Sequence, residues 1–137
     1  MQIVVAKPPN WDALNAVFHV EQRRGVIFAF GELIYNPDNV RISQPLMRHE
    51  AVHGVRQRRV GVDAWWTRYI EEADYRLAEE LPSHMAEYEQ FCMDQSDRNA
   101  RSRYLFECAG RLAGPLYGGL LTRSQAKRAI LTGRLPT

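Results

Sequence analysis

Cysteine is scarce in this chain of 137 residues, which contains only Cys92 and Cys108. The two form neither a CxxC pair nor a disulfide-rich framework, so a scaffold held together by disulfides is excluded and a cysteine-based metal site is not supported. We expect two partly buried free thiols in a reducing compartment. A disulfide between adjacent helices is the alternative that the sequence leaves open.

Long apolar runs are also missing. No segment approaches the roughly 18 consecutive apolar residues that a membrane span requires. The apolar stretch at the N-terminus ends at Lys7, Pro8 and Pro9, which makes it too short for the core of a signal peptide. The sequence therefore predicts a soluble protein without a membrane partner. We expect a cytoplasmic location, or association with a virion.

An excess of charge of one sign is absent as well. The net charge is +2, with 25% charged and 45% hydrophobic residues, which is ordinary for a globular protein. So small a net charge argues against a nucleic-acid-binding protein. The length suits one core, and no repeat or low-complexity tract divides the chain. Residues 1–137 are therefore predicted to form a single domain.

Turn-forming and capping residues divide the chain into a small sheet followed by helices. Segments 2–6, 26–30 and 33–35 are rich in β-formers, and a helix is predicted over 11–21. Further helices are predicted over 43–61, from 63 with a kink or restart at Pro82, over 97–113 and over 122–133, capped by Ser43, Asp63, Asp97 and Thr122. The predicted fold class is α+β and mainly α, with a small β-sheet packed on the helix 43–61.

Residues 49–53 read His-Glu-Ala-Val-His, the HExxH pattern. On a helix, His49 and His53 lie one turn apart on the same face, so both imidazoles can reach one metal ion at about 2.0–2.1 Å. Glu50 is rotated by about 100° around the helix, where it can act as general base on a metal-activated water. The alternative is a helix with two partly exposed histidines, but the predicted cap and the preceding strands favour a zinc site.

The third ligand is open at this point. The extended motif HExxHxxGxxH is excluded, because Arg56 and Arg59 stand where it needs glycine and histidine. No cysteine lies nearby, which leaves a glutamate from a downstream helix. The candidates are Glu71, Glu72, Glu79, Glu80, Glu87 and Glu89.

The segment 46–57, LMRHEAVHGVRQ, resembles a group of small metallopeptidase-like proteins that are often encoded by phages or prophages. These proteins tend to show HExxHxxxQ, an aromatic-rich helix and then E-x-x-A-Y. The stretch 80–84 fits the last element best, with Ser83 in place of the alanine and His84 in place of the tyrosine. Segments 34–37 and 115–130 are also similar to that group.

This resemblance implies a minimal zincin-like domain of the gluzincin type, the class that includes thermolysin. It implies zinc held by His49, His53 and Glu80, and hydrolysis of a peptide or protein substrate with Glu50 as general base. Glu87 is the next candidate ligand, followed by Glu72 and Glu79. A kink at Pro82 would change which carboxylate points at the metal.

Two further side chains are candidates for supporting roles. Gln57 follows His53 by four residues and shares its face, so it is predicted to bind substrate or a ligand unless it is a surface residue. His84 lies one turn beyond Glu80 and is predicted to stabilise an oxyanion or support a ligand, with a surface position as the alternative. Glu87 is a candidate for such a supporting role as well. An edge strand near 26–30 could hold an extended peptide by strand addition.

Two other functions remain open. A catalytically weak or inactive protein could use zinc to hold its helices together as a structural or interaction module, associated with a phage. The basic run Arg56, Arg58 and Arg59 could bind nucleic acid, but cations at the end of a helix also offset its dipole.

Overall fold

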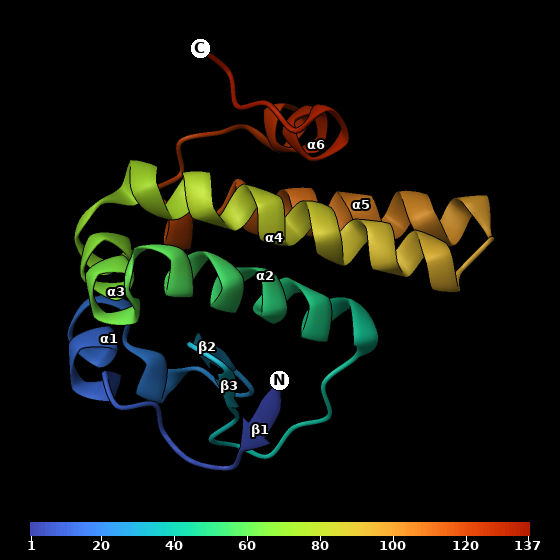
Figure 1. Ribbon diagram of the computed structural model, residues 1–137. Helices are drawn as coiled ribbons and strands as arrows, with labels where there is room; N and C mark the ends of the chain where they lie inside the picture. Colours follow the sequence, from blue (N-terminus) through green and yellow to red (C-terminus); the bar gives the residue numbers. More distant parts are fainter.

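The elements are stacked in layers in the computed structural model, which describes residues 1–137 (Figure 1). A small sheet and the helix α1 (Trp11–Phe18) form one side, and α2 (Gln44–Val60) with α3 (Val62–Glu71) lie next to them. The long helix α4 (Ala73–Asp94) and α5 (Arg98–Leu112) follow, and α6 (Arg123–Thr132) covers the other side. Short 3-10 turns, η1 (Val20–Gln22) and η2 (Pro115–Tyr117), complete the chain. The predicted mainly helical α+β fold is confirmed.

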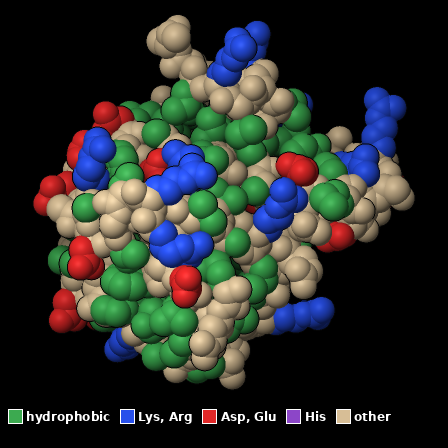
Figure 2. Space-filling model, in the orientation of Figure 1, with side chains coloured by type: hydrophobic (Ala, Val, Ile, Leu, Met, Phe, Trp, Pro, Cys, Tyr) green, Lys and Arg blue, Asp and Glu red, His purple; other side chains and the backbone are tan.

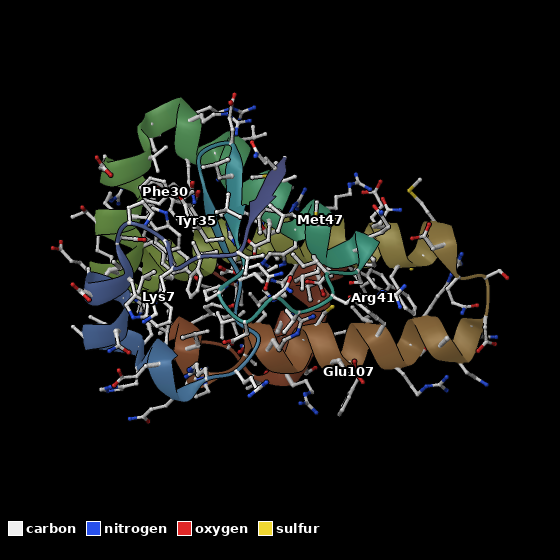
Figure 3. The ribbon with its side chains drawn as sticks, turned by 90° about the horizontal axis from the view of Figure 1, so that it is seen from below. Lys7, Phe30, Tyr35, Arg41, Met47 and Glu107 are labelled. Atoms are coloured by element: carbon white, nitrogen blue, oxygen red, sulfur yellow. The ribbon has the colours of Figure 1, made fainter.

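The sheet has three short strands in the order β1–β3–β2. Strand β1 (Gln2–Val4) runs parallel to β3 (Leu33–Tyr35), and β2 (Phe28–Phe30) pairs with β3 antiparallel through a tight turn at Gly31. Gly31 has φ 63°, a left-handed conformation that glycine adopts without strain. Seen from below, the strands lie against α2, and the ring of Phe30 packs edge-on against Tyr35 (Figure 3). The predicted hairpin is confirmed, with β2 at an edge of the sheet.

Three of the four predicted helix caps are confirmed. The side chains of Ser43, Asp97 and Thr122 accept hydrogen bonds from backbone N–H groups in the first turns of α2, α5 and α6. The prediction for Asp63 is wrong, because α3 begins directly after Gly61 and Asp63 lies inside its first turn. None of the helices combines the length and the apolar character needed to cross a membrane.

The break predicted at Pro82 falls elsewhere. The chain is extended at Glu72, between α3 and α4, and α4 continues through Pro82 without restarting. Proline removes one backbone hydrogen bond, but burial of the neighbouring Leu81 and Ser83 stabilises the helix through tertiary packing. Glu80 and Glu87 therefore lie two turns apart on one helix.

Two apolar clusters lie on opposite sides of the molecule. One joins α4, α5 and α6 around Leu81, Leu105 and Leu112, and the other surrounds Trp65 and Phe28 between α1, β2 and α3. Helix α2 runs between them and carries a row of buried polar side chains, namely His49, Glu50, His53 and Gln57. Buried polar groups are unfavourable unless they have partners, so this row marks the part of the fold where a functional site is expected.

Gln57 joins α2 to the β2–β3 hairpin. Its Oε1 accepts a hydrogen bond from the Gly31 N–H at 2.7 Å, and its Nε2 donates to the Ala29 carbonyl at 2.9 Å. Gly54 permits this close approach, because a Cβ at that position would lie 2.5 Å from the Gly31 carbonyl oxygen. Gln57 is fully buried and its amide is occupied by the backbone. The predictions of a substrate contact and of a surface position are both wrong for this residue.

Gln57→Ala is therefore expected to lower the free energy of unfolding by about 2–4 kcal/mol, because it leaves a buried N–H and a buried carbonyl without partners. Urea unfolding of the purified variant measures the change. Gln90→Ala is the matched control, since the Gln90 amide contacts only Asp94 at the surface, and its change should stay within about 0.5 kcal/mol. Equal effects in the two variants would contradict the assigned role of Gln57.

Candidate metal centre

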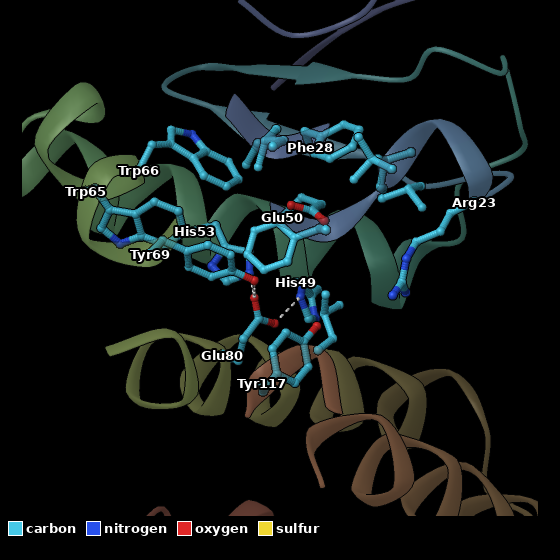
Figure 4. Close-up of a pocket in the computed structure, with 17 residues that line it drawn as sticks. Arg23, Phe28, His49, Glu50, His53, Trp65, Trp66, Tyr69, Glu80 and Tyr117 are labelled. Carbon is cyan, nitrogen blue, oxygen red and sulfur yellow. Dashed lines mark hydrogen bonds and ion pairs between the residues drawn. The ribbon is translucent and has the colours of Figure 1, made fainter. Parts of the chain in front are cut away.

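Helices α2 and α4 bring three side chains to one point. The Nε2 atoms of His49 and His53 lie 3.2 Å and 3.0 Å from Oε1 and Oε2 of Glu80, respectively (Figure 4). The relative exposures of His49, His53 and Glu80 are 5%, 5% and 2%, and no histidine is visible on the face of the molecule drawn in Figure 2. One ligand atom from each residue lies within 4.8 Å of the others.

This geometry fits a metal ion. Ligand atoms about 2.0–2.1 Å from a tetrahedral ion lie about 3.3 Å from one another, close to the two separations between the histidines and Glu80. The carboxylate oxygen Oε1 of Glu80 is buried without a directed hydrogen bond, which is unfavourable unless a cation binds it. Two histidines and a glutamate leave one coordination position open, as catalytic zinc sites do. The His49–His53–Glu80 group could therefore hold a metal ion.

The carboxylates around His49 favour a positive charge at that position. Burial alone would lower the pKa of His49, but the carboxylates of Glu80 and Glu87 outweigh burial and raise it to about 10. Burial likewise favours the neutral form of Glu80, yet the neighbouring His53 and His49 hold the pKa of its carboxyl well below the ordinary value. The site thus favours a negative carboxylate with a positive charge next to it, which the protonated ring of His49 supplies here and a metal ion could supply in its place.

Glu87 does not join the three converging side chains. Its Oε1 lies 2.9 Å from Nδ1 of His49, the ring nitrogen that faces away from Glu80. Its other oxygen accepts from the hydroxyl of Tyr104 at 3.0 Å and pairs with Arg111. Burial alone would raise the pKa of Glu87, but His49 and Arg111 keep it below the ordinary value. A carboxylate on the second nitrogen of a histidine fixes the orientation of the ring toward a metal.

His84 is fully buried, so the surface position considered for it is wrong. Its Nδ1 lies 2.8 Å from the Glu80 carbonyl, and its ring stands edge-on to those of His49 and Tyr117. Burial and the nearby His49 lower the pKa of His84 to about 4, which leaves a neutral ring at neutral pH. His84 is absent from the wall of the cavity described below, so it supports the backbone at Glu80 and does not face a substrate.

The other glutamates have different partners. Glu79 pairs with Arg56 at 2.7 Å and accepts from the Trp65 indole at 2.6 Å, while Glu72 and Glu89 pair with arginines nearer the surface. Glu71 is exposed. Of the six candidates, only Glu80 meets both histidines through its carboxylate. The basic run is partly explained too, since Arg56 holds Glu79 and Arg58 donates to the Gly31 carbonyl.

A cavity of about 120 Å³ opens onto these ligands. Most of its wall is apolar, with residues from α1, η1, β2, α3 and η2. Its polar wall consists of Arg23, His49, Glu50, His53, Tyr69, Glu80 and Tyr117 (Figure 4). Tyr69 donates a hydrogen bond to Oε2 of Glu80 at 2.6 Å. Burial is the largest cause of the raised pKa values of Tyr69 and Tyr117, so both remain protonated hydrogen-bond donors.

Glu50 lines the same cavity but stands apart from the three ligands. Burial raises the pKa of its carboxyl, while His49, His53 and the N–H of Ala29 act in the opposite direction. A carboxylate with a raised pKa is a better proton acceptor, which suits a general base. The histidines of HExxH thus point to Glu80, where they could bind a metal ion, while the glutamate of the motif faces the cavity, where it could accept a proton.

The sequence reasoning missed two residues of the cavity wall, Arg23 and Tyr117. Tyr117 belongs to segment 115–130, which resembles the metallopeptidase-like group, but that resemblance did not assign a role to the tyrosine. Nothing in the sequence pointed to Arg23. The two cysteines are free, and Cys108 donates to Glu87.

Comparison of the chain with protein-family models, with curated proteins and with solved structures finds no match. The function is therefore argued from the site itself.

Proposed function

We propose that this protein is a zinc-dependent metallopeptidase with a gluzincin-like site. The observation that supports this function is the arrangement of one cavity wall, where His49, His53 and Glu80 converge and Glu50 stands free beside them. Three ligands with one open position, together with a separate carboxylate, are the parts that metal-assisted hydrolysis requires. Zinc is the ion that this donor set suits best.

A zinc ion bound there would supply Lewis acidity, which polarises a carbonyl group and lowers the pKa of water toward neutrality. Glu50 takes a proton from the attacking water at its carboxylate and then delivers a proton to the nitrogen of the leaving amine. Tyr69 and Tyr117 keep protonated hydroxyl groups in the cavity wall, and the Tyr69 hydroxyl donates to Glu80 and so helps to orient that carboxylate. Glu87 keeps the ring of His49 oriented.

The second candidate is a structural or interaction protein that uses zinc without catalysis, with phage association resting on the resemblance alone. The burial of the three ligands and their origin on two long helices favour this function, because a metal ion would join α2 to α4. The open cavity beside Glu50 favours the enzyme, since a purely structural site is closed by four protein ligands.

Elemental mass spectrometry of the tag-free protein is expected to find about one zinc per chain. A chelator should remove the ion and lower the midpoint of thermal unfolding, because the ion binds the folded state. Hydrolysis of a peptide library should be lost with the metal and restored by added zinc. Zinc without any hydrolysis would favour the structural protein, and no zinc after its addition would overturn both proposals.

A further inference from the structure

The free edge of β2 is largely closed by side chains from α2. The Ala29 carbonyl and the Gly31 N–H, which face away from β3, are taken by Gln57, and the Gly31 carbonyl accepts from Arg58 at 2.8 Å. The Ala29 N–H faces the carboxylate of Glu50. Strand addition along residues 29–31, as the sequence suggested for segment 26–30, would have to displace these bonds. The edge strand is therefore a poor platform for a long extended peptide.

The backbone just before β2 is not closed in this way. Val26 and Ile27 make no backbone hydrogen bond within the chain, and both line the cavity next to Phe28. A bound substrate can thus form main-chain hydrogen bonds at no more than these two residues, just before the closed stretch. This favours a short substrate, or the end of a longer one.

The wall of the same cavity carries a cation whose side chain has no partner. Arg23 is the only lysine or arginine in the cavity wall. The residue is exposed and its backbone N–H donates to the Val20 carbonyl, but its guanidinium group forms no ion pair or hydrogen bond within the protein. Figure 4 shows its side chain extending along the side of the cavity opposite Trp65 and Trp66. A guanidinium group binds a carboxylate through two parallel hydrogen bonds, so a free arginine at this place suits a carboxylate of the substrate.

The apolar part of the cavity sets the size of the group next to that carboxylate. Its walls include Leu14, Phe18, Val20, Val26 and Leu116. The cavity volume is about 120 Å³, and one water molecule takes up roughly 10–15 Å³ by the same measure, so the cavity has room for about ten waters. The space therefore suits one large aliphatic or aromatic side chain and excludes several residues.

We propose that the substrate is an N-acylated apolar amino acid with a free α-carboxylate, such as the C-terminal residue of a peptide. Its side chain fills the apolar cavity, its backbone contacts Ile27 and its carboxylate binds Arg23. This inference rests on the proposed function, which supplies the reaction. The water oxygen bonds to the acyl carbon, the carbon–nitrogen bond breaks, and a proton goes to the nitrogen. The products are a free apolar amino acid and a shortened acid.

Binding tests this recognition separately from catalysis. Calorimetry with zinc-loaded Glu50→Gln protein, which is expected to bind substrate without hydrolysing it, should find N-acetyl-L-phenylalanine bound about tenfold more tightly than N-acetyl-L-phenylalaninamide, the size expected for a hydrogen bond to a charged group. The Arg23 and Arg24 variants are made in the same background. Arg23→Gln should remove the preference, and Arg23→Lys should restore part of it. Arg24→Gln is the matched control, because Arg24 is an exposed neighbour of equal charge outside the cavity wall. It should keep the preference.

Equal affinities for acid and amide would overturn the inference, as would an equal loss of the preference in Arg23→Gln and Arg24→Gln.

Cleavage assays form the second test. Their substrates are peptides that end in phenylalanine, either as the acid or as the amide, and N-acyl phenylalanine. The inference is supported if phenylalanine is released from the acids faster than phenylalaninamide is released from the corresponding amides. The relative rates for the peptide acid and for N-acyl phenylalanine then show whether a peptide or an N-acyl amino acid is the preferred substrate. Cleavage of internal peptide bonds at the same rate as release of the C-terminal residue would overturn this inference but leave the proposed peptidase function standing. A binding preference without any hydrolysis supports the recognition site and overturns the proposed function.

Discussion

Glu50→Gln is expected to lower kcat for hydrolysis by about 10²–10⁴-fold, the range that a positioned general base contributes. Glutamine has the shape of glutamate but cannot accept a proton from water at neutral pH. Because Glu50 lines the cavity and is not one of the three converging ligands, zinc content should stay at about one per chain. Steady-state kinetics and elemental analysis of the same preparation measure both quantities.

The stability of this variant gives an independent readout. Burial raises the pKa of Glu50, so the folded protein holds its proton more tightly than the unfolded chain does. When the pKa of a carboxyl is higher in the folded protein than in the unfolded chain, the free energy of unfolding falls as pH rises from the unfolded pKa through the folded pKa, because the carboxyl then becomes charged in the fold. At neutral pH, metal-free Glu50→Gln should therefore unfold at an equal or higher temperature than the wild type.

Glu89→Gln is the control for these assays, since Glu89 is exposed and pairs only with Arg48. It should match the wild type in rate and in metal content. Wild-type hydrolysis by Glu50→Gln would refute its role as general base. Loss of zinc from that variant would instead place Glu50 among the ligands.

Local sequence rules were sufficient for most of the elements and for the two histidines, although the helix predicted over 11–21 ends at Phe18. The spacing of His49 and His53 fixes their common face on any helix, and the caps at Ser43, Asp97 and Thr122 act within one turn. The hairpin followed from the turn at Gly31, for the same local reason. What these rules could not settle was how the helices face one another.

The choice among the downstream glutamates shows this limit. Which carboxylate meets the histidines depends on the rotation of α4 against α2, and that rotation depends on tertiary packing. The sequence placed a break at Pro82, whereas the chain breaks at Glu72, so Glu80 and Glu87 share one helix face. Resemblance pointed to Glu80, while helical periodicity alone could not separate it from Glu87.

Residues whose partners are distant in the chain were the hardest to interpret. Gln57 was placed correctly on the face of the histidines, but its partners lie 26 and 28 residues away in the hairpin. Arg23 reaches the cavity because the chain before β2 wraps beside α1, an arrangement without a local signature. Long-range hydrogen bonds and cavity walls are properties of the packed chain, so local sequence patterns could not assign them.

The relative zinc affinities of Glu80→Gln and Glu87→Gln should separate a ligand from the residue that orients one. Glu80→Gln removes the carboxylate that meets both histidines, so zinc should bind more than about 100-fold more weakly. Glu87→Gln removes only the carboxylate behind His49, for which a loss of about 10–100-fold is expected. Competition with a chelator of known zinc affinity measures both losses.

Glu79→Gln is the matched control, because Glu79 is a buried glutamate on the same helix whose partners are Arg56 and Trp65. Its affinity for zinc should stay within about threefold of the wild type, since it contacts neither histidine. A larger loss in Glu87→Gln than in Glu80→Gln would move the third ligand to Glu87. Because His49 contacts Glu80 through Nε2 and Glu87 through Nδ1, that reversal would also require its ring to bind the metal through the opposite nitrogen.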